Sequence, residues 1–516
     1  MNFARVCRVL AAFVVFYTVA QLAPLTLAFF EPEVPGISPI AGLAWGLAIG
    51  LVVAALLWFS GRGAAHSFYR RETICVAGVA WFLASLLGAI PYLWSGLLPD
   101  SADALFESVS GLTTCGGTVL GCAGNPPPEG TPDSLLLWRA LQQWLGGIGI
   151  VLIFVALLPS MGAASKQLLT AESVGVSNDA YQPRIRAQAR GVAIVYVTLT
   201  VLCIVCLMTI GSMGLFDAIC HAFTTLATGG YSTRSTVGSF HDLGVEVVLT
   251  VFMFLGGMSF VAMAVAARDG WRGFRDLLRG SELRIYALFT ALAIAIVTEE
   301  LVRAGLGFGE ALRQASFNVV SMLSCCGYAT ADFQAWPALC LIVIWTCTMV
   351  GGCTGSAAGG LKQVRLLVCL KLLAYSLRQF VRPKSVERLR LDGEVLPAAT
   401  VSSILSMVLL WLLTVLLGGM VLALDQRLSF IGALSASASM LGNCGPAMTT
   451  VVPEALHQIP PAIAVGVEVV GPNIGPLAGY GDLSTYAKLA MCFEMVLGRL
   501  ELLTLLALFS PSFWRR

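Results

Sequence analysis

Long apolar runs dominate this chain of 516 residues. Each contains about 20 residues or more, enough to cross a hydrocarbon core of roughly 30 Å as a helix. Only 12% of the residues are charged, about half the share that is usual in soluble domains. The sequence therefore predicts an all-α polytopic membrane protein with ten spans, near residues 5–30, 38–60, 73–97, 134–158, 190–211, 243–267, 284–305, 335–372, 399–422 and 484–509.

Basic residues fall mainly on one side of the predicted membrane. If the spans alternate from a cytoplasmic N-terminus, 24 of the 31 Lys and Arg residues lie in cytoplasmic segments, mostly in the loops 61–72, 159–190, 268–284 and 361–398. Such a bias is typical of cytoplasmic loops. We therefore expect both termini in the cytoplasm. The first run is too long for a cleaved signal and is expected to remain as a span.

A short apolar helix followed by a glycine occurs four times. The segments begin at residues 104, 218, 315 and 433 and read ALFESVSGLTTCGGTV, AICHAFTTLATGGYST, ASFNVVSMLSCCGYAT and ALSASASMLGNCGPAM. About 11 to 13 helical residues precede each break, so each helix can go only halfway across a membrane. The pattern predicts four repeats of span, half-helix, glycine turn and span, with turns at Gly116, Gly230, Gly327 and Gly445.

The half-helices indicate a water-filled path for cations. Non-helical backbone at membrane depth is tolerated only where it is buried in protein or lines a wet cavity. We therefore expect the four turns to face one another, with the partially negative C-terminal ends of the half-helices directed inward. Glycine allows the positive φ that lets successive carbonyls turn toward one axis. The alternative is that these glycines are only helix-packing sites.

The repeats divide the chain into five predicted parts. An N-terminal pair of spans covers residues 1–66, and the four pore repeats cover residues 67–170, 171–275, 276–390 and 391–516. The repeats are expected to form a pseudo-fourfold array around one pore.

Residues 351–360, GGCTGSAAGG, interrupt the longest apolar run with five glycines. Each glycine costs about 1 kcal/mol in a helix interior, so we expect a break that crosses the pore. The alternative is a packing kink.

Arg499 lies near mid-membrane in the last run, where a charge is expensive and usually functional. The alternative is that its side chain snorkels to the inner surface. A guanidinium can bind loop carbonyls, so loop and arginine together predict a gate.

Four other charged residues lie near the predicted turns. Asp103 and Glu107 open the first half-helix, where they either cap it and interact with its dipole or draw cations to the mouth. Asp332, after the third turn, has the same two interpretations. Lys488, at the outer end of the last run, is expected to be an interfacial anchor.

Several motifs make the chain similar to a known family. They are SGLTTCGGTVL from residue 110, WRALQQWLGGIGI from 138, TTLATGGYST from 224, VVSMLSCCGYATADF from 319, GGCTGSAAGGLK from 351, NCGPAM from 443 and MVLGRLELLTLLALFSPSFW from 495. Over about 400 residues the chain resembles the bacterial TrkH type of potassium uptake protein, within the superfamily that includes the Ktr and plant HKT transporters. The two spans before residue 61 resemble the additional N-terminal pair of the Trk branch.

The resemblance implies potassium uptake across the bacterial inner membrane, by a channel or a symport mechanism, in a homodimer with a cytosolic TrkA-type regulatory subunit that has nucleotide-binding domains. It implies a potassium filter lined by carbonyls of Thr114, Cys115, Gly116, Thr228, Gly229, Gly230, Cys325, Cys326, Gly327, Asn443, Cys444 and Gly445. It also places a gate at Gly351, Gly352, Gly355, Ser356, Gly359, Gly360, Lys362 and Arg499. Membrane lipid surrounds such a protein, and no nucleic acid is involved.

The chain departs from the family pattern at a few positions. The third turn has Cys325 and Cys326 where the family usually has threonines, and the first has Cys115 and Gly117 where Thr and Ala are usual. Carbonyls rather than side chains would hold the ion, so coordination can survive these changes. Sodium conduction or cation-coupled carriage by the same fold therefore stays an alternative. Ala357 stands where the family commonly has Thr, which affects hydrogen bonding in the loop.

Two other classes of function fit the sequence less well. A membrane-embedded transferase needs positioned carboxylates, a histidine or a nucleophile, and the chain has no HExxH, no aspartate-rich pair and no Gly-x-Ser-x-Gly. The chain lacks the Cys and His spacings that are typical of metal ligands, so we expect no metal centre. A receptor without a pathway would not need four half-helices. The sequence predicts a potassium transporter, not an enzyme, with potassium as substrate and no bound cofactor.

Overall fold

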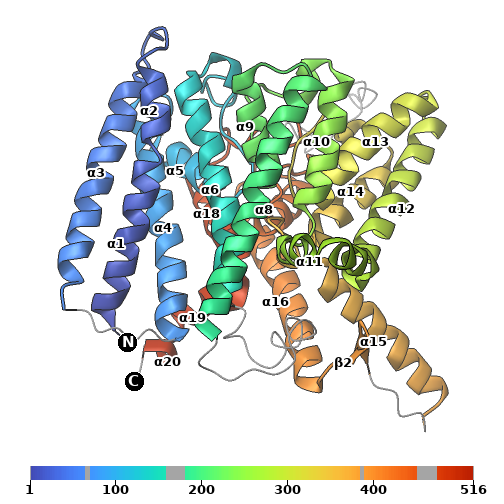
Figure 1. The fold of residues 1–516 in the computed structure, drawn as a ribbon. Helices are drawn as coiled ribbons and strands as arrows, with labels where there is room; N and C mark the ends of the chain where they lie inside the picture. Colours follow the sequence, from blue (N-terminus) through green and yellow to red (C-terminus); the bar gives the residue numbers. More distant parts are fainter. Residues whose placement is uncertain (1, 64–69, 158–180, 384–388, 450–472, 515–516) are drawn as a thin grey trace.

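The computed structural model describes residues 2–63, 70–157, 181–383, 389–449 and 473–514. Within these ranges the chain is mostly helical (Figure 1). The helices are α1 (Phe3–Val19), α2 (Leu22–Ala28), α3 (Pro39–Ser60), α4 (Arg70–Trp94), α5 (Ser101–Leu112), α6 (Asp133–Leu157), α8 (Tyr181–Thr209), α9 (Leu215–Leu226), α10 (Leu243–Gly256), α11 (Phe260–Arg279), α12 (Ser281–Arg303), α13 (Phe308–Leu323), α14 (Ala338–Val350), α15 (Gln363–Val381), α16 (Ala398–Leu422), α17 (Phe430–Gly442), α18 (Thr485–Arg499), α19 (Leu502–Phe509) and α20 (Pro511–Trp514).

Smaller elements join these helices. Among the described residues, three short 3-10 helices lie in the loops: η1 (Pro128–Gly130), η4 (Val237–Phe240) and η5 (Phe333–Ala335). A two-stranded antiparallel hairpin, β1 (Arg390–Leu391) with β2 (Glu394–Val395), precedes α16.

Four short helices, α5, α9, α13 and α17, alternate with other helices along the chain, which are longer in every case except α14, with 13 residues after α13. Each packs against both of its chain neighbours, as α5 does with α4 and α6. The helix that follows each short helix also packs against the next short helix: α6 on α9, α10 on α13 and α14 on α17, while α18 packs on α5. The contacts therefore run in cyclic order. Three of the short helices have 12 or 13 residues, but α13 has 16 and is longer than expected.

Polar residues fix where several of these helices begin. The Asp100 carboxylate accepts a hydrogen bond from the Ala102 amide (2.9 Å) and caps α5. The Asp242 carboxylate caps α10 through the Gly244 amide (2.7 Å), and the Ser429 hydroxyl caps α17 through the Gly432 amide (3.1 Å). These side chains satisfy amides that have no partner inside the helix. The cap of the first half-helix is thus Asp100 rather than Asp103 or Glu107, but Asp103 lies in the first turn, where an acidic residue interacts favourably with the helix dipole.

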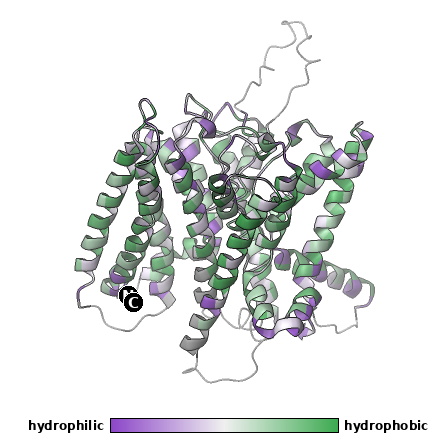
Figure 2. Ribbon diagram, turned by 45° about the horizontal axis from the view of Figure 1, so that its top comes forward, coloured by the Kyte–Doolittle hydropathy of each residue, from purple (hydrophilic) through white to green (hydrophobic). Residues whose placement is uncertain are grey.

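Six helices of the described residues are long and apolar enough to cross a membrane, or seven if the bent pair α10–α11 is counted. They match the predicted runs 5–30, 38–60, 73–97, 190–211, 284–305 and 399–422. The run 134–158 corresponds to α6, a helix of 25 residues. Figure 2 shows hydrophobic residues along the upright helices and hydrophilic residues toward their ends.

The span predicted over 243–267 is interrupted by a sharp bend that the sequence did not predict. α10 ends at Gly256, and α11 continues at an angle of 92°. Tyr286 lies close against Gly257, where any Cβ would collide with the phenol oxygen. The Ser259 hydroxyl then accepts a hydrogen bond from the Ala262 amide (3.4 Å) and begins the new helix. A close tertiary contact and a cap therefore override the continuous apolar pattern.

The last predicted run, 484–509, is also broken. α18 ends at Arg499, and Glu501 has a left-handed φ of 60° before α19 begins at Leu502. The Glu501 carboxylate forms an ion pair with Arg365 of α15. The positive φ of Glu501 cannot occur inside a right-handed helix, so the helix breaks at this residue, whose side chain binds a distant part of the chain.

The two ends of the described chain lie side by side (Figure 1). The rings of Phe3 and Trp514 stack with their centroids 6.3 Å apart. Both ends are therefore on the same side of the helical array.

Candidate functional site

The four short helices all end in the same backbone conformation. Each helix is followed by a turn whose first residue has a left-handed φ. Two residues later in the same turn, a glycine has a positive φ. The first set is Thr114 (55°), Thr228 (55°), Cys325 (56°) and Asn443 (50°), and the second is Gly116 (85°), Gly230 (73°), Gly327 (87°) and Gly445 (100°). Such values are unfavourable for residues with a Cβ, so the glycines of the second set fit their positions.

The four turns approach one another in cyclic order. A Cβ built on each glycine would lie less than 3.0 Å from a carbonyl oxygen of the following turn. Gly116 faces the oxygen of Gly229, Gly230 that of Cys326, Gly327 that of Cys444, and Gly445 that of Cys115. The structure thus brings together all four predicted turns, from Thr114–Gly116, Thr228–Gly230, Cys325–Gly327 and Asn443–Gly445. Only glycine leaves room for these neighbouring carbonyls.

Side chains of the half-helices and of neighbouring helices hold the turns. The Ser110 hydroxyl donates to the Gly117 carbonyl (2.5 Å), and the Ser321 hydroxyl donates to the Tyr328 carbonyl (2.7 Å) at the same spacing. The Tyr480 hydroxyl donates to the Gly445 carbonyl (2.6 Å). These contacts fix carbonyls that would otherwise be free to rotate.

Gln143 of α6 binds the second turn at two points. Its side-chain amide donates to the Gly229 carbonyl (2.7 Å), and its side-chain oxygen accepts from the Tyr231 amide (3.2 Å). Gln143 was not among the predicted site residues. The adjacent glutamines Gln142 and Gln143 inside an apolar run could have indicated a buried polar contact.

The cysteines of the turns have their side chains in the protein interior. Cys115, Cys325, Cys326 and Cys444 are fully buried. The Cys115 sulfur lies 3.8 Å from the Met440 sulfur, and the Cys444 sulfur lies 3.7 Å from the Met322 sulfur. These thiols therefore behave as small apolar groups that pack behind the backbone.

A cavity of about 70 Å³ opens directly onto the four turns. All four positive-φ glycines line it, together with Arg139, Arg234 and Pro128. At its rim, the Glu129 carboxylate accepts hydrogen bonds from the Ser235 amide (2.6 Å) and hydroxyl (2.8 Å). Partial burial acts to raise the pKa of Glu129, but the hydrogen bonds from Ser235 outweigh it and lower the pKa. Glu129, which adjoins Pro128 and Ser235 of the cavity lining, is therefore ionised at neutral pH.

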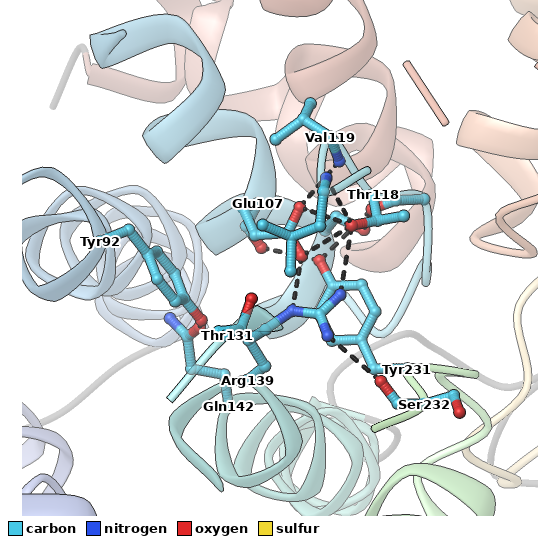
Figure 3. A network of polar contacts seen from close by, with 12 residues as sticks. Tyr92, Glu107, Thr118, Val119, Thr131, Arg139, Gln142, Tyr231 and Ser232 are labelled. Atoms are coloured by element: carbon cyan, nitrogen blue, oxygen red, sulfur yellow. Dashed lines mark hydrogen bonds and ion pairs between the residues drawn. The ribbon is translucent and has the colours of Figure 1, made fainter. Parts of the chain in front are cut away.

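Glu107 lies in a buried polar network beside this cavity (Figure 3). Its carboxylate pairs with the Arg139 guanidinium (2.7 Å) and accepts from the Thr118 hydroxyl (3.0 Å) and the Val119 amide (3.0 Å). Arg139 also lies 3.9 Å from the centre of the Tyr231 ring. Glu107 is completely buried, so it neither caps α5 nor faces the mouth, and both predicted roles are wrong.

Asp103, Lys488 and Asp332 also have structural contacts. Asp103 and Lys488 are buried and form an ion pair, and Asp103 accepts a second bond from the Asn125 side chain (3.1 Å). The prediction that Lys488 is an interfacial anchor is therefore wrong, because a partner on α5 holds it inside the protein. The Asp332 carboxylate accepts from the Gln334 amide (3.1 Å) and caps η5, which is the first of its two predicted roles.

The predicted interruption at 351–360 lies between α14, which ends at Val350, and α15, which begins at Gln363. Gly351, Gly355 and Gly360 have φ values of 71°, 76° and 73°, and Lys362 has 76°. The Gly360 amide donates to the Gly442 carbonyl at the end of α17 (3.0 Å). The loop is therefore attached to the base of the fourth turn.

Arg499 reaches this loop from the end of α18. Its guanidinium donates to the Ala357 carbonyl (2.6 Å) and to the Gly146 carbonyl of α6 (3.3 Å). The side chain is buried, so the alternative that it snorkels to the surface is wrong. Ala357 accepts the hydrogen bond from Arg499 through its backbone carbonyl. This bond does not need the hydroxyl of the threonine that the family commonly has at this position.

Three side chains in the loop or directly after it donate to loop carbonyls. The Lys362 ammonium donates to the Ala358 carbonyl, and the Ser356 hydroxyl donates to the Cys353 carbonyl (2.6 Å). The Gln363 side chain donates to the Gly351 carbonyl (2.8 Å). A second cavity, of about 40 Å³, lies between the loop and α18 and is lined by Gly355, Ser356, Ala358, Gly359, Gly360, Lys362, Arg365, Met407, Trp411, Asn443, Gly498, Arg499, Glu501 and Leu502.

The model of the TrkH family, described as "Cation transport protein", matches residues 43–451. The chain belongs to the TrkH family. Members are membrane-spanning cation transporters rather than enzymes.

Named relatives and a solved structure resemble this TrkH-family chain over its whole length. The chain is 30% identical to the Trk system potassium uptake protein TrkH of Halomonas elongata, with 100% of both chains covered. It is 29% identical to the protein of the same name from Escherichia coli K12, again with 100% of both covered. The crystal structure of the potassium transporter TrkH from Vibrio parahaemolyticus has a TM-score of 0.85, 27% identity and 100% coverage of both chains. The polytopic helical fold predicted from the sequence is thus confirmed.

The Glu107–Arg139 pair should be important for the stability of this TrkH-family fold. Arg139→Gln leaves the Glu107 carboxylate buried without its counter-charge, a change that typically costs about 3–5 kcal/mol. We expect a large fall in the melting temperature of the detergent-purified protein. Arg303→Gln is the control, because Arg303 and Glu299 form an exposed pair worth about 0–1 kcal/mol. Equal melting temperatures for the two variants would show that the buried pair has no special role.

Proposed function

We propose that this chain carries potassium ions across the bacterial inner membrane through the ring of four turns. The main support is the cyclic approach of each glycine to a carbonyl of the next turn. Potassium filters use rings of backbone carbonyls that replace the hydration shell of the ion. The names of the relatives from Halomonas elongata and Escherichia coli, which are potassium uptake proteins, support potassium as the ion.

The proposed filter consists of the carbonyls from Thr114 to Gly116, Thr228 to Gly230, Cys325 to Gly327 and Asn443 to Gly445. One turn comes from each of the proposed repeats 67–170, 171–275, 276–390 and 391–516, in a pseudo-fourfold array after the pair of spans in 1–66. The C-terminal ends of α5, α9, α13 and α17 adjoin these turns. Their partial negative charges favour a cation at the centre.

The proposed gate is the loop from Gly351 to Gly360 with Arg499. The hydrogen bond from Arg499 to the Ala357 carbonyl supports this role, because it holds a fixed positive charge beside the loop. A cation leaving the filter would meet both. Lys362 belongs to the same group, since its ammonium binds the loop carbonyl of Ala358.

We further propose a homodimer with both termini in the cytoplasm and a TrkA-type regulatory subunit with nucleotide-binding domains on the cytosolic face. The proximity of Phe3 and Trp514 supports a common side for the termini. The basic segments 268–284 and 361–398 support the choice of the cytoplasmic side, and 361–398 offers contacts for an acidic surface.

Growth of a bacterium that lacks its potassium uptake systems tests the proposed function. With this chain and its regulatory partner supplied, we expect growth on low potassium. Failure to grow, with the protein present in the membrane, would overturn the proposal. Sodium conduction is the alternative, because cysteines occupy three of the four turns. Sodium-dependent growth inhibition without potassium rescue would favour it.

A further inference from the structure

α11 lies across the direction of the upright helices (Figure 1). α10 has 14 residues, so it covers roughly 21 Å and ends before it has crossed a hydrocarbon core of about 30 Å. α12 begins at Ser281, directly after α11, and its 23 residues cover roughly 34 Å, enough for a complete crossing. The end of α11 therefore lies at the membrane surface from which α12 starts.

The second half of α11, residues 271–279, has an exposed apolar face. A kink at Gly270, with φ 62° and ψ −139°, separates it from the first half. Trp271, Phe274 and Leu278 follow the spacing of one helix face and are 78%, 45% and 52% exposed. The Trp271 and Phe274 rings are 5.8 Å apart. Aromatic side chains with this exposure are typical of the interface between membrane and water.

A basic face lies next to the apolar face. It contains Arg272, Arg275 and Arg279, spaced by three or four residues, and Arg268 lies just before the kink. Asp269 forms an ion pair with Arg268 (2.9 Å), and Asp276 lies 4.0 Å from Arg275. Among the described residues, no acidic partner pairs with Arg272 or Arg279. The two acidic residues therefore leave two of these four positive charges uncompensated.

We propose that residues 271–279 form a binding site for an anionic phospholipid, such as phosphatidylglycerol. Trp271, Phe274 and Leu278 enter the boundary between headgroups and acyl chains, while Arg272 and Arg279 bind the headgroup phosphate. In-plane helices with aromatic and leucine residues on one face and basic residues on the other bind membranes in this way. Juxtamembrane basic residues are attracted to anionic lipid by about 1 kcal/mol each.

The structure favours lipid over a protein partner as the occupant. The site is continuous with the start of a complete span at Ser281, so lipid headgroups are its immediate neighbours. The proposed regulatory subunit is a cytosolic protein, which would need the apolar residues to face water before it binds. Binding of that subunit to this helix is therefore an outcome that the test must be able to detect.

The bend before α11 is hydrogen-bonded to the intramembrane loop. The Cys353 amide donates to the Gly257 carbonyl (2.8 Å), and the Phe260 amide donates to the Gly355 carbonyl (3.0 Å). A lipid that holds α11 thereby acts on residues 351–360. This consequence for ion flux rests on the proposed gate, whereas the lipid site does not.

The test measures fluorescence quenching of Trp271 in vesicles of phosphatidylcholine with increasing fractions of phosphatidylglycerol. Bromine is placed on the acyl chains of one lipid or the other, and the signal of the Trp271→Leu variant is subtracted. We expect brominated phosphatidylglycerol to quench at a lower mole fraction than brominated phosphatidylcholine. Arg272→Gln with Arg279→Gln should raise the half-quenching fraction roughly tenfold or more.

Arg378→Gln with Arg382→Gln is the matched control, because it also removes two exposed positive charges from the chain, at the end of α15. It should leave the half-quenching fraction unchanged. Equal quenching by the two lipids, no Trp271-dependent quenching, or an equal effect of both double variants would each overturn the lipid site. So would loss of regulator binding in Arg272→Gln/Arg279→Gln with normal lipid quenching. Intact quenching with flux that does not depend on phosphatidylglycerol would remove only the link to the loop.

Discussion

Replacing Gly327 by serine is expected to reduce the preference for potassium over sodium about tenfold. Gly327 has a φ of 87°, which costs a residue with a Cβ roughly 1–2 kcal/mol, and about 1.4 kcal/mol corresponds to a factor of ten. The new Cβ would also collide with the Cys444 carbonyl of the next turn. The backbone ring must therefore shift at two adjacent turns. Relative fluxes of the two ions into proteoliposomes measure the effect.

Gly307→Ser is the control for this variant. Gly307 is the N-cap residue at the other end of the same half-helix, with a φ of −62° and no atom within 4 Å of an added Cβ. Serine is favourable at such a position. Its ion preference should equal that of the unmodified chain. If Gly327→Ser also keeps the original preference in a well-folded protein, the glycine ring is not the filter.

Replacing Arg499 by alanine is expected to raise the basal ion flux and to make it less dependent on the regulatory subunit. A cation 4 Å from a fixed positive charge is repelled by about 4 kcal/mol at an effective dielectric constant of 20. Removal of that repulsion corresponds to an increase of up to roughly a thousandfold. The variant also loses the hydrogen bond to the Ala357 carbonyl, which frees the loop. Flux into liposomes without the regulatory subunit measures the change.

Arg499→Lys separates charge from hydrogen bonding at the gate. Lysine keeps the positive charge but cannot reach both Ala357 and Gly146 with a planar fork of donors. We expect a basal flux between those of the alanine variant and the unmodified chain. Wild-type basal flux in Arg499→Ala, with an unchanged elution volume, would mean that Arg499 is a structural anchor and that the gate lies elsewhere.

The sequence predicted the short helices and the conformation of the turns because both depend on local chemistry. A half-helix that stops before a glycine has few alternatives inside a membrane, and the positive φ values of Gly116, Gly230, Gly327 and Gly445 agree with this expectation. The left-handed φ two residues before each glycine was not predicted. The break at 351–360 was predictable for the same reason, since five glycines cannot sustain a buried helix.

Features that depend on distant partners were not predictable. The bend after α10 requires Tyr286 against Gly257, and nothing in the apolar run 243–267 indicates this contact. Lys488 looked like an interfacial anchor because Asp103, its partner, lies 385 residues away in the sequence. The ion pair of Glu107 with Arg139 was likewise not predictable, because it depends on the packing of α5 against α6, which buries both side chains.

Relative potassium and sodium flux through the purified, unmodified chain in liposomes, with the proposed regulatory subunit supplied, tests the central claim most directly. We predict potassium flux well above sodium flux, and loss of this difference in Gly327→Ser but not in Gly307→Ser. Equal flux of the two ions through the unmodified chain, or a sodium flux that exceeds the potassium flux, would contradict the claim that the four turns form a potassium filter.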